Sequence, residues 1–144
     1  MSQEPAFWDS SALVPLCLAP QATAAHYRHA RRTLPVVWWS TPVEVRSAIV
    51  RHFRTQPGRE GSLAGALARL AAGRRSWREV LPSERVRELA MGCLDAGDLR
   101  AADALQLAAA LVWCGEQPQR RPFLCADARL AAAGERAGFA VVRL

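Results

Sequence analysis

The sequence predicts an α/β fold of three layers, with a parallel sheet of about four to five strands flanked by helices. Short apolar runs that suit strands alternate with longer segments of helical periodicity along the whole chain. Such alternation is typical of a parallel sheet that helices cover on both faces. The length of 144 residues suits one domain, and we expect residues 1–144 to form it.

The first forty residues predict two strands separated by helices. Residues 6–10 (AFWDS) form the first, buried strand. The helix at 11–20 is expected to be short or kinked, because Pro15 lies inside it. Residues 21–32 form an amphipathic helix with arginines on one face, and residues 35–40 (PVVWWS) form the second strand.

The rest of the chain continues the alternation. A helix at 41–54 begins favourably, because Thr41 can cap it and Pro42 suits its first position. A loop with proline and glycine follows at 55–62. The later elements are a helix at 62–77, an extended stretch at 78–82, helices at 83–97 and 99–113, a strand at 121–127, a helix at 128–138 and a strand at 139–144.

The charge favours a polyanionic partner or an acidic protein partner. The net charge is +6, and every basic side chain is an arginine, although a compositional bias is the alternative explanation. No apolar stretch approaches the roughly 18 residues that span a bilayer, and the N-terminal sequence does not resemble an export signal. We therefore expect a cytoplasmic protein without membrane contact. The four cysteines follow no metal-binding pattern and are expected to be buried thiols.

The five tryptophans bear on whether the chain stacks on bases. Four of them lie in apolar runs and are expected in the core: Trp8, Trp38, Trp39 and Trp113. Trp77 lies among arginines and is the one expected at a surface or an interface.

Four carboxylates are expected at one edge of the sheet. Asp9 and Asp127 end two predicted strands, while Glu44 and Asp103 lie in the first turns of two predicted helices. Parallel strands end at the same edge, where α/β proteins bind their ligands. Acids so placed repel one another unless a cation lies between them. The alternative is that each is only a helix cap or a helix-start carboxylate; Asp98 is a further, fifth candidate.

Clustered carboxylates in a basic chain suit a hard divalent cation. Mg²⁺ and Mn²⁺ prefer oxygen ligands and are commonly held by a few carboxylates and a substrate phosphate. Such a site can lower the pKa of a bound water and stabilise a phosphodiester transition state. The arginines would then bind the substrate backbone.

Four segments resemble, in order and spacing, the motifs of PIN-domain ribonucleases: WDSSALVPL, PVEVRSAIVR, LRAADALQLAAAL and FLCADARLAAAGERAGFAVV. The chain is most similar to the VapC-type toxins of type II toxin–antitoxin modules, and the resemblance covers nearly its whole length. It implies a PIN-like fold and a Mg²⁺- or Mn²⁺-dependent endoribonuclease that cleaves RNA with a metal-activated water. It also implies a homodimer that a small antitoxin neutralises by entering the active-site groove. Pro15 departs from the polar residue common in the family.

The resemblance assigns roles to particular residues. The catalytic and metal positions of the family fall on Asp9, Glu44, Asp103 and Asp127. The supporting hydroxyl falls on Ser10. Arg46 and Arg100 lie close in sequence to two of the acids and are candidates for binding RNA phosphate or an antitoxin carboxylate. The alternative function is a non-catalytic module that binds nucleic acid or a partner and keeps the acids only as caps.

Overall fold

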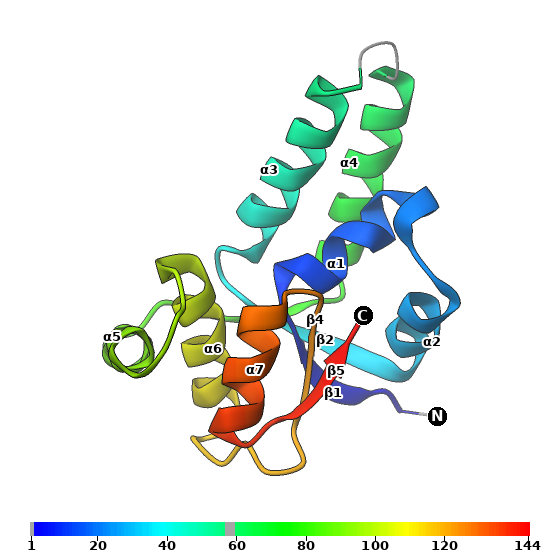
Figure 1. Cartoon of the computed structure of the whole chain (residues 1–144). Coiled ribbons are helices and arrows are strands. Elements are labelled where there is room, and N and C mark those ends of the chain that lie inside the picture. The colour runs from blue at the N-terminus through cyan, green and yellow to red at the C-terminus, as the bar shows by residue number, and fades with distance from the viewer. Residues whose placement is uncertain (1, 57–59) are drawn as a thin grey trace.

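The computed structural model describes residues 2–56 and 60–144, and its centre is a five-stranded, all-parallel sheet (Figure 1). The strand order is β3-β2-β1-β4-β5, so the first strand lies in the middle of the sheet. The strands are β1 (Glu4–Trp8), β2 (Thr33–Trp38), β3 (Arg78–Val80), β4 (Pro122–Cys125) and β5 (Ala140–Arg143). The predicted three-layer α/β fold is confirmed.

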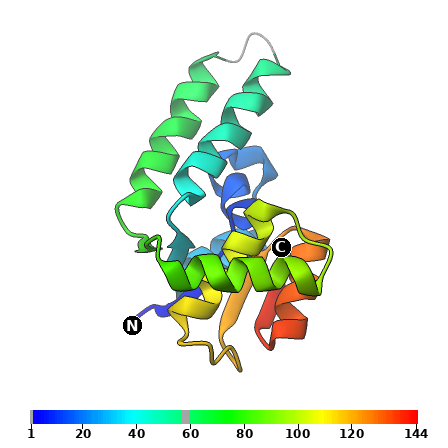
Figure 2. The same cartoon turned by 90° about the vertical axis from the view of Figure 1, so that its left-hand side faces the viewer.

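Helices cover both faces of the sheet. They are α1 (Ser10–Cys17), α2 (Ala24–Arg32), α3 (Thr41–Arg54), α4 (Glu60–Arg74), α5 (Glu84–Ala96), α6 (Ala101–Trp113) and α7 (Ala128–Ala137), with a short 3-10 helix at Ala19–Gln21. Helices α1, α3 and α4 pack on one face, and α5, α6 and α7 pack on the other. The helices α3 and α4 lie side by side and extend away from the sheet (Figures 1 and 2).

The pleat of the central strand divides the core into two halves. Trp8 is fully buried on the side of α1 and α3, whereas Phe7 is fully buried on the side of α6. The Phe7 ring stacks on Phe123 of the neighbouring β4, with 5.4 Å between ring centroids. Nε1 of Trp8 donates to Oγ1 of Thr33 at 3.0 Å, so the buried indole keeps a hydrogen-bond partner. These anchors fix β1, whose carboxyl end carries Asp9.

Two predicted strands extend too far. β1 ends at Trp8 and β4 ends at Cys125, each before the acid that was expected to terminate it. Asp9 is instead the N-cap of α1, and Asp127 is the N-cap of α7. Both residues have extended backbone dihedrals, which an N-cap shares with a strand, so the apolar pattern alone does not separate the two.

Other boundaries differ by a few residues. The helix predicted at 41–54 matches α3, but its N-cap is Ser40, and Thr41 is a buried residue of the first turn. The second strand lies at Thr33–Trp38 instead of 35–40, because α2 and β2 follow each other directly. The fourth predicted helix, at 62–77, corresponds to α4, which begins two residues earlier at Glu60 and ends three residues earlier at Arg74. Residues 57–59 of the predicted loop at 55–62 lie outside the described residues.

The prediction that Trp39 lies in the core is wrong. Trp39 is 52% exposed, although it continues the apolar run of β2. Trp38 is buried, whereas Trp77 and Trp113 are half-buried at the edges of the two core halves. In the parts of the chain that the structure describes, none of the helices has both the length and the apolar character needed to cross a membrane.

Candidate active site

The candidate acids lie at the carboxyl edge of the sheet, where the chain passes from strand to helix. Asp9 follows β1 and Asp127 follows β4, and these two strands are paired neighbours. The N–H of Asp9 donates to the carbonyl of Leu124 at 2.9 Å, which extends the pairing to the site. Glu44 and Asp103 lie in the first turns of α3 and α6. The topology therefore brings the four predicted acids to one edge.

Asp9 is almost completely buried, and α1 holds its carboxylate. The backbone N–H of Ser11 donates to Oδ2 of Asp9 at 3.0 Å, and the Ser11 hydroxyl donates to the same oxygen. Ser10 Oγ lies 3.5 Å from Oδ1, at the limit of a hydrogen bond. Ser10, the predicted supporting residue, therefore makes only this long contact with Asp9, and Ser11, which was not predicted, makes the shorter ones.

Glu44 is half-buried, and two donors hold one of its oxygens. Ser40 Oγ donates to Oε2 at 3.1 Å, and Nε2 of Gln106 donates to the same oxygen at 2.9 Å. Within the described part of the chain, Oε1 of Glu44 receives no hydrogen bond. Oε1 of Glu44 therefore remains available to a ligand, and Oδ1 of Asp9 has only the 3.5 Å contact with Ser10 Oγ.

Gln106 was not among the site residues predicted from the sequence. This side chain is 1% exposed and also donates to Oγ1 of Thr41 at 3.1 Å, with Ser10 Oγ at 3.4 Å. A signal was present in the sequence. Gln106 lies three residues after Asp103, hence on the same helix face, and it interrupts an otherwise apolar run.

The carboxylates interact electrostatically. Burial raises the pKa of Asp9 above its ordinary value, the negative charge of Asp103 adds to the effect, and hydrogen bonds from Ser11 oppose it. Burial likewise raises the pKa of Glu44, where hydrogen bonds from Ser40 and Gln106 oppose the repulsion from Asp9 and Asp103. The negative charges of Asp9 and Asp103 therefore raise the pKa of Glu44, and the charge of Asp103 also raises that of Asp9.

Asp103 and Asp127 form the outer part of the site. Burial and the charge of Asp127 raise the pKa of Asp103, against the lowering effect of Arg100 and Arg129. Asp127 is exposed, and its Oδ1 accepts from the N–H of Leu130 at 2.8 Å, as an N-cap does. Asp9 and Asp127 are therefore both helix N-caps, as the alternative interpretation expects. In each residue, only one carboxylate oxygen accepts the capping N–H.

The residues fit a divalent cation by chemistry. Carboxylate and hydroxyl oxygens are the donors that Mg²⁺ and Mn²⁺ prefer, and the mutual repulsion of the acids would be relieved by a cation. Within residues 2–56 and 60–144, however, no three His, Cys, Asp or Glu side chains form a group that could hold a metal ion directly. Waters retained by the cation would have to complete such a site, as is common for Mg²⁺.

The thiols contribute nothing to this chemistry. Burial raises the pKa of Cys125 to about 12, and the charges of Asp9 and Asp127 add to the effect. Cys17, Cys93 and Cys114 also have a pKa raised by burial. All four cysteines are free, and Cys93 alone is only half-buried, so the expectation of buried thiols is largely confirmed.

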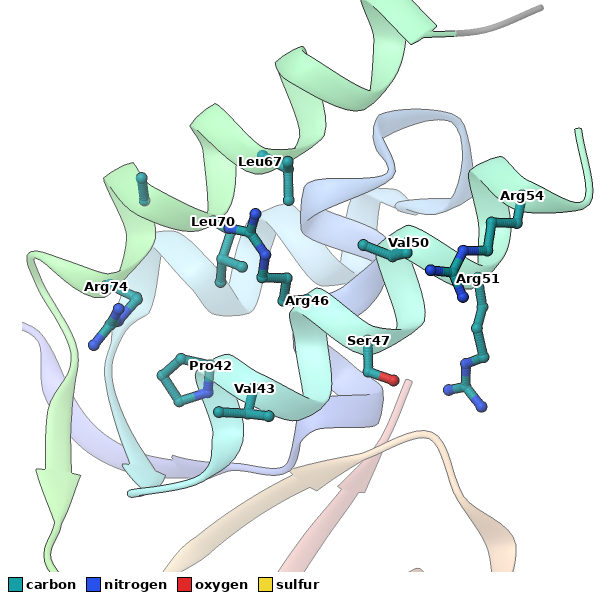
Figure 3. Close-up of a pocket in the computed structure, with 11 residues that line it drawn as sticks. Pro42, Val43, Arg46, Ser47, Val50, Arg51, Arg54, Leu67, Leu70 and Arg74 are labelled. Carbon is teal, nitrogen blue, oxygen red and sulfur yellow. The ribbon is translucent and has the colours of Figure 1, made fainter. Parts of the chain in front are cut away.

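A basic cleft lies between α3 and α4 (Figure 3). Its volume is about 540 Å³, its floor contains Leu67 and Leu70, and four arginines line it: Arg46, Arg51, Arg54 and Arg74. A second cavity of about 700 Å³ is lined by Ser10, Ser11 and Glu44. Arg51 lines both cavities, so the basic cleft adjoins, along α3, the cavity that Glu44 lines.

The two candidate arginines and Asp98 lie in different places relative to the acids. Arg46 lines the basic cleft, whereas Arg51, seven residues after Glu44 on the same helix face, is the arginine that shares a cavity with the acid. Arg100 is exposed beside Asp103 and lowers its pKa. Asp98 is highly exposed and lies 3.7 Å from Arg129, which places it in a surface ion pair.

Comparisons with known proteins support the fold alone. No family model matches the chain, and the search of curated proteins found no significant match. The structure is similar to the crystal structure of PAE2754 from Pyrobaculum aerophilum, with a TM-score of 0.64 and 21% sequence identity. The similarity covers 96% of this chain and 90% of that one. The chain therefore shares an overall fold with PAE2754 over nearly its whole length.

Proposed function

We propose that the protein is a Mg²⁺- or Mn²⁺-dependent endoribonuclease of the PIN-domain type and acts as the toxin of a VapC-like toxin–antitoxin module. The observation that carries the proposal is the convergence of four carboxylates at the carboxyl edge of a parallel sheet. Glu44 is held through one oxygen and leaves the other available, while Asp9 is held mainly through Oδ2 and has only a 3.5 Å contact on Oδ1. The sequence motifs that resemble the family lie at these same positions.

In this proposal, Asp9, Glu44 and Asp103 hold the cation, directly or through water, and Asp127 orients the attacking water or holds a second ion. The bound cation would supply a water of lowered pKa and positive charge for the phosphodiester transition state. Ser11 keeps Asp9 in place, and Gln106 and Ser40 keep Glu44 in place.

The basic cleft supports a polyanionic substrate. Arg46, Arg51 and Arg54 lie on α3 beside the cavity that contains Glu44, so they would hold RNA phosphates while the scissile bond lies at the acids. An acidic segment of a small antitoxin would compete for the same arginines. A homodimer and a cytoplasmic location complete the proposal; the free cysteines support the second, because a reducing compartment keeps thiols free.

The test is the Asp9→Asn variant, measured for RNA cleavage with Mn²⁺ and for Mn²⁺ binding by calorimetry. We expect cleavage to be abolished and Mn²⁺ affinity to fall, while circular dichroism shows an intact fold. Asp95→Asn, on the exposed face of α5, is the matched control and should behave as wild type. Undiminished cleavage by Asp9→Asn contradicts the assignment.

The non-catalytic alternative has support of its own. Asp9 and Asp127 are N-caps, and the described residues contain no ready-made group of three metal ligands. A protein of this kind would bind RNA or an acidic partner through the basic cleft without specific Mn²⁺ binding. Calorimetry on the wild-type protein therefore separates the two functions.

A further inference from the structure

Gln106 is a polar side chain enclosed in an apolar environment. It is 1% exposed, and its helical neighbours Leu107 and Ala108 to Ala110 belong to the buried core. Nε2 is fully used, with Glu44 at 2.9 Å and Thr41 at 3.1 Å, whereas Oε1 is buried and has no hydrogen-bond partner among residues 2–56 and 60–144. Burial of an amide whose carbonyl oxygen lacks a partner costs free energy.

Core stability alone does not account for an amide at this position. A methionine has nearly the same length, suits a helix and would leave no carbonyl oxygen unpaired. What methionine lacks is the N–H group that reaches across from α6 to α1 and α3. The contacts of Nε2 with Glu44 and Thr41, and the longer one with Ser10, link the three elements that carry Asp9, Glu44 and Asp103.

The contact with Glu44 is the one with chemical consequences. Ser40, the N-cap of α3, and Gln106 from α6 both donate to Oε2 of Glu44. Two donors on one oxygen restrict rotation of the carboxylate and leave Oε1 free beside the cavity that Glu44 lines. Because α6 also carries Asp103, the same amide ties the position of Glu44 to the helix of another acid of the site.

We propose that Gln106 is a positioning residue for the metal site, which fixes the carboxylate of Glu44 so that its Oε1 is presented to the divalent cation. This inference rests on the proposed function and adds to it a residue outside the set of acids. Groups that orient a metal ligand through a hydrogen bond commonly change metal affinity or activity by about 10–100-fold when they are removed.

The first test is Gln106→Met, with Leu107→Met as the control for a methionine in the same buried helix. We expect Mn²⁺ affinity, measured by calorimetry, to fall about 10–100-fold. The kcat for RNA cleavage at a fixed Mn²⁺ concentration should fall while KM for RNA is unchanged, since the arginines that hold RNA are untouched. Leu107→Met should leave both unchanged. Wild-type Mn²⁺ affinity in Gln106→Met overturns the inference.

A second variant isolates the path through Glu44. In a Glu44→Gln background, Gln106→Met should cause no further loss of Mn²⁺ affinity, because the carboxylate that it positions is absent. A loss as large as in the wild-type background means that Gln106 acts elsewhere and overturns the inference.

A third measurement needs no substitution at Gln106 and so does not depend on whether that variant folds. The side-chain amide resonances of Gln106 in the wild-type protein should shift when Mg²⁺ is added to saturation, and should not shift in Glu44→Gln. Amide resonances that do not move at saturating Mg²⁺ overturn the inference while the proposed function stands. A wild-type protein that binds no Mn²⁺ overturns the proposed function, and the inference with it.

Discussion

The hydroxyl of Ser11 donates a hydrogen bond to Oδ2 of Asp9 and accepts one of 2.8 Å from the backbone N–H of Ala126. One serine thus joins the carboxylate after β1 to the segment after β4. Because Asp127 follows Ala126 directly, this contact helps to fix the spacing of the two acids at the edge of the sheet. It also satisfies a backbone donor that would otherwise lose its partner.

Ser11→Ala is expected to lower both stability and activity. The change leaves the N–H of Ala126 without its partner and removes a donor from the buried carboxylate of Asp9, at a cost of about 1–3 kcal/mol. Denaturant unfolding and RNA cleavage measure the two effects. Ser62→Ala, an exposed serine of α4, is the control and should have no effect. Ser10→Ala should be the milder variant at the site, and a larger effect there would contradict the observed geometry.

The raised pKa values of three site acids predict that the stability of the folded protein depends on pH. Burial raises the pKa of Asp9, Glu44 and Asp103 in the folded protein. A carboxyl group whose pKa is raised on folding stabilises the fold when protonated, and this contribution is lost as pH rises through the folded pKa. The charged acids therefore destabilise the metal-free protein at neutral pH.

Asp9→Asn tests this penalty, because asparagine keeps an oxygen that can cap α1 but carries no charge. In metal-free buffer we expect the thermal midpoint of Asp9→Asn to exceed that of the wild type near pH 7. The difference should shrink as the pH falls toward the ordinary pKa of 3.8. Scanning calorimetry across this range measures it, with Asp95→Asn as the control. A less stable Asp9→Asn at neutral pH would contradict the direction of the pKa shift.

Arg51→Ala is expected to weaken RNA binding. If Arg51 neutralises one phosphate, its loss should reduce the slope of log affinity against log salt by about 1 and weaken binding several-fold at physiological salt. Fluorescence anisotropy in an Asp9→Asn background measures affinity without cleavage. Arg87 is the matched control, since it is exposed on α5 and pairs with Glu84 at 3.0 Å. Equal losses for the two variants would mean that the basic cleft has no special role.

Substitution of Trp8 should lower the free energy of unfolding much more than substitution of Trp39, because Trp8 is buried and Trp39 is exposed. Trp8 is fully buried and donates to Thr33, so Trp8→Ala should cost about 3–5 kcal/mol. Trp39 is 52% exposed, so Trp39→Ala should cost less than about 1 kcal/mol. Denaturant unfolding of both variants measures the difference, and similar costs would contradict the placement of Trp39 at the surface.

Local pattern was sufficient for most elements of the fold. The helix α3 was predicted with its observed bounds, because Pro42 and an amphipathic run mark it in the sequence. Ser83, the first residue of the helix predicted at 83–97, is the N-cap of α5 and accepts from the N–H of Val86 at 3.2 Å. Asp9 and Asp127 were assigned to strand ends because an N-cap and a strand share extended dihedrals. Trp39 was wrongly assigned to the core because the apolar run of β2 continues through it, and the pattern does not show that the strand ends at Trp38.

The sequence by itself determined the class of fold, the four acids and the sheet edge at which they meet, because these follow from strand and helix order and from the parallel arrangement. Only the tertiary structure decided which neighbours hold the acids. Ser11 contacts Ala126 across 115 residues of sequence, and Gln106 contacts Glu44 across 62. Such contacts depend on how α1, α3 and α6 pack against the sheet, and packing between elements distant in the chain leaves no periodic mark on the sequence of any one of them.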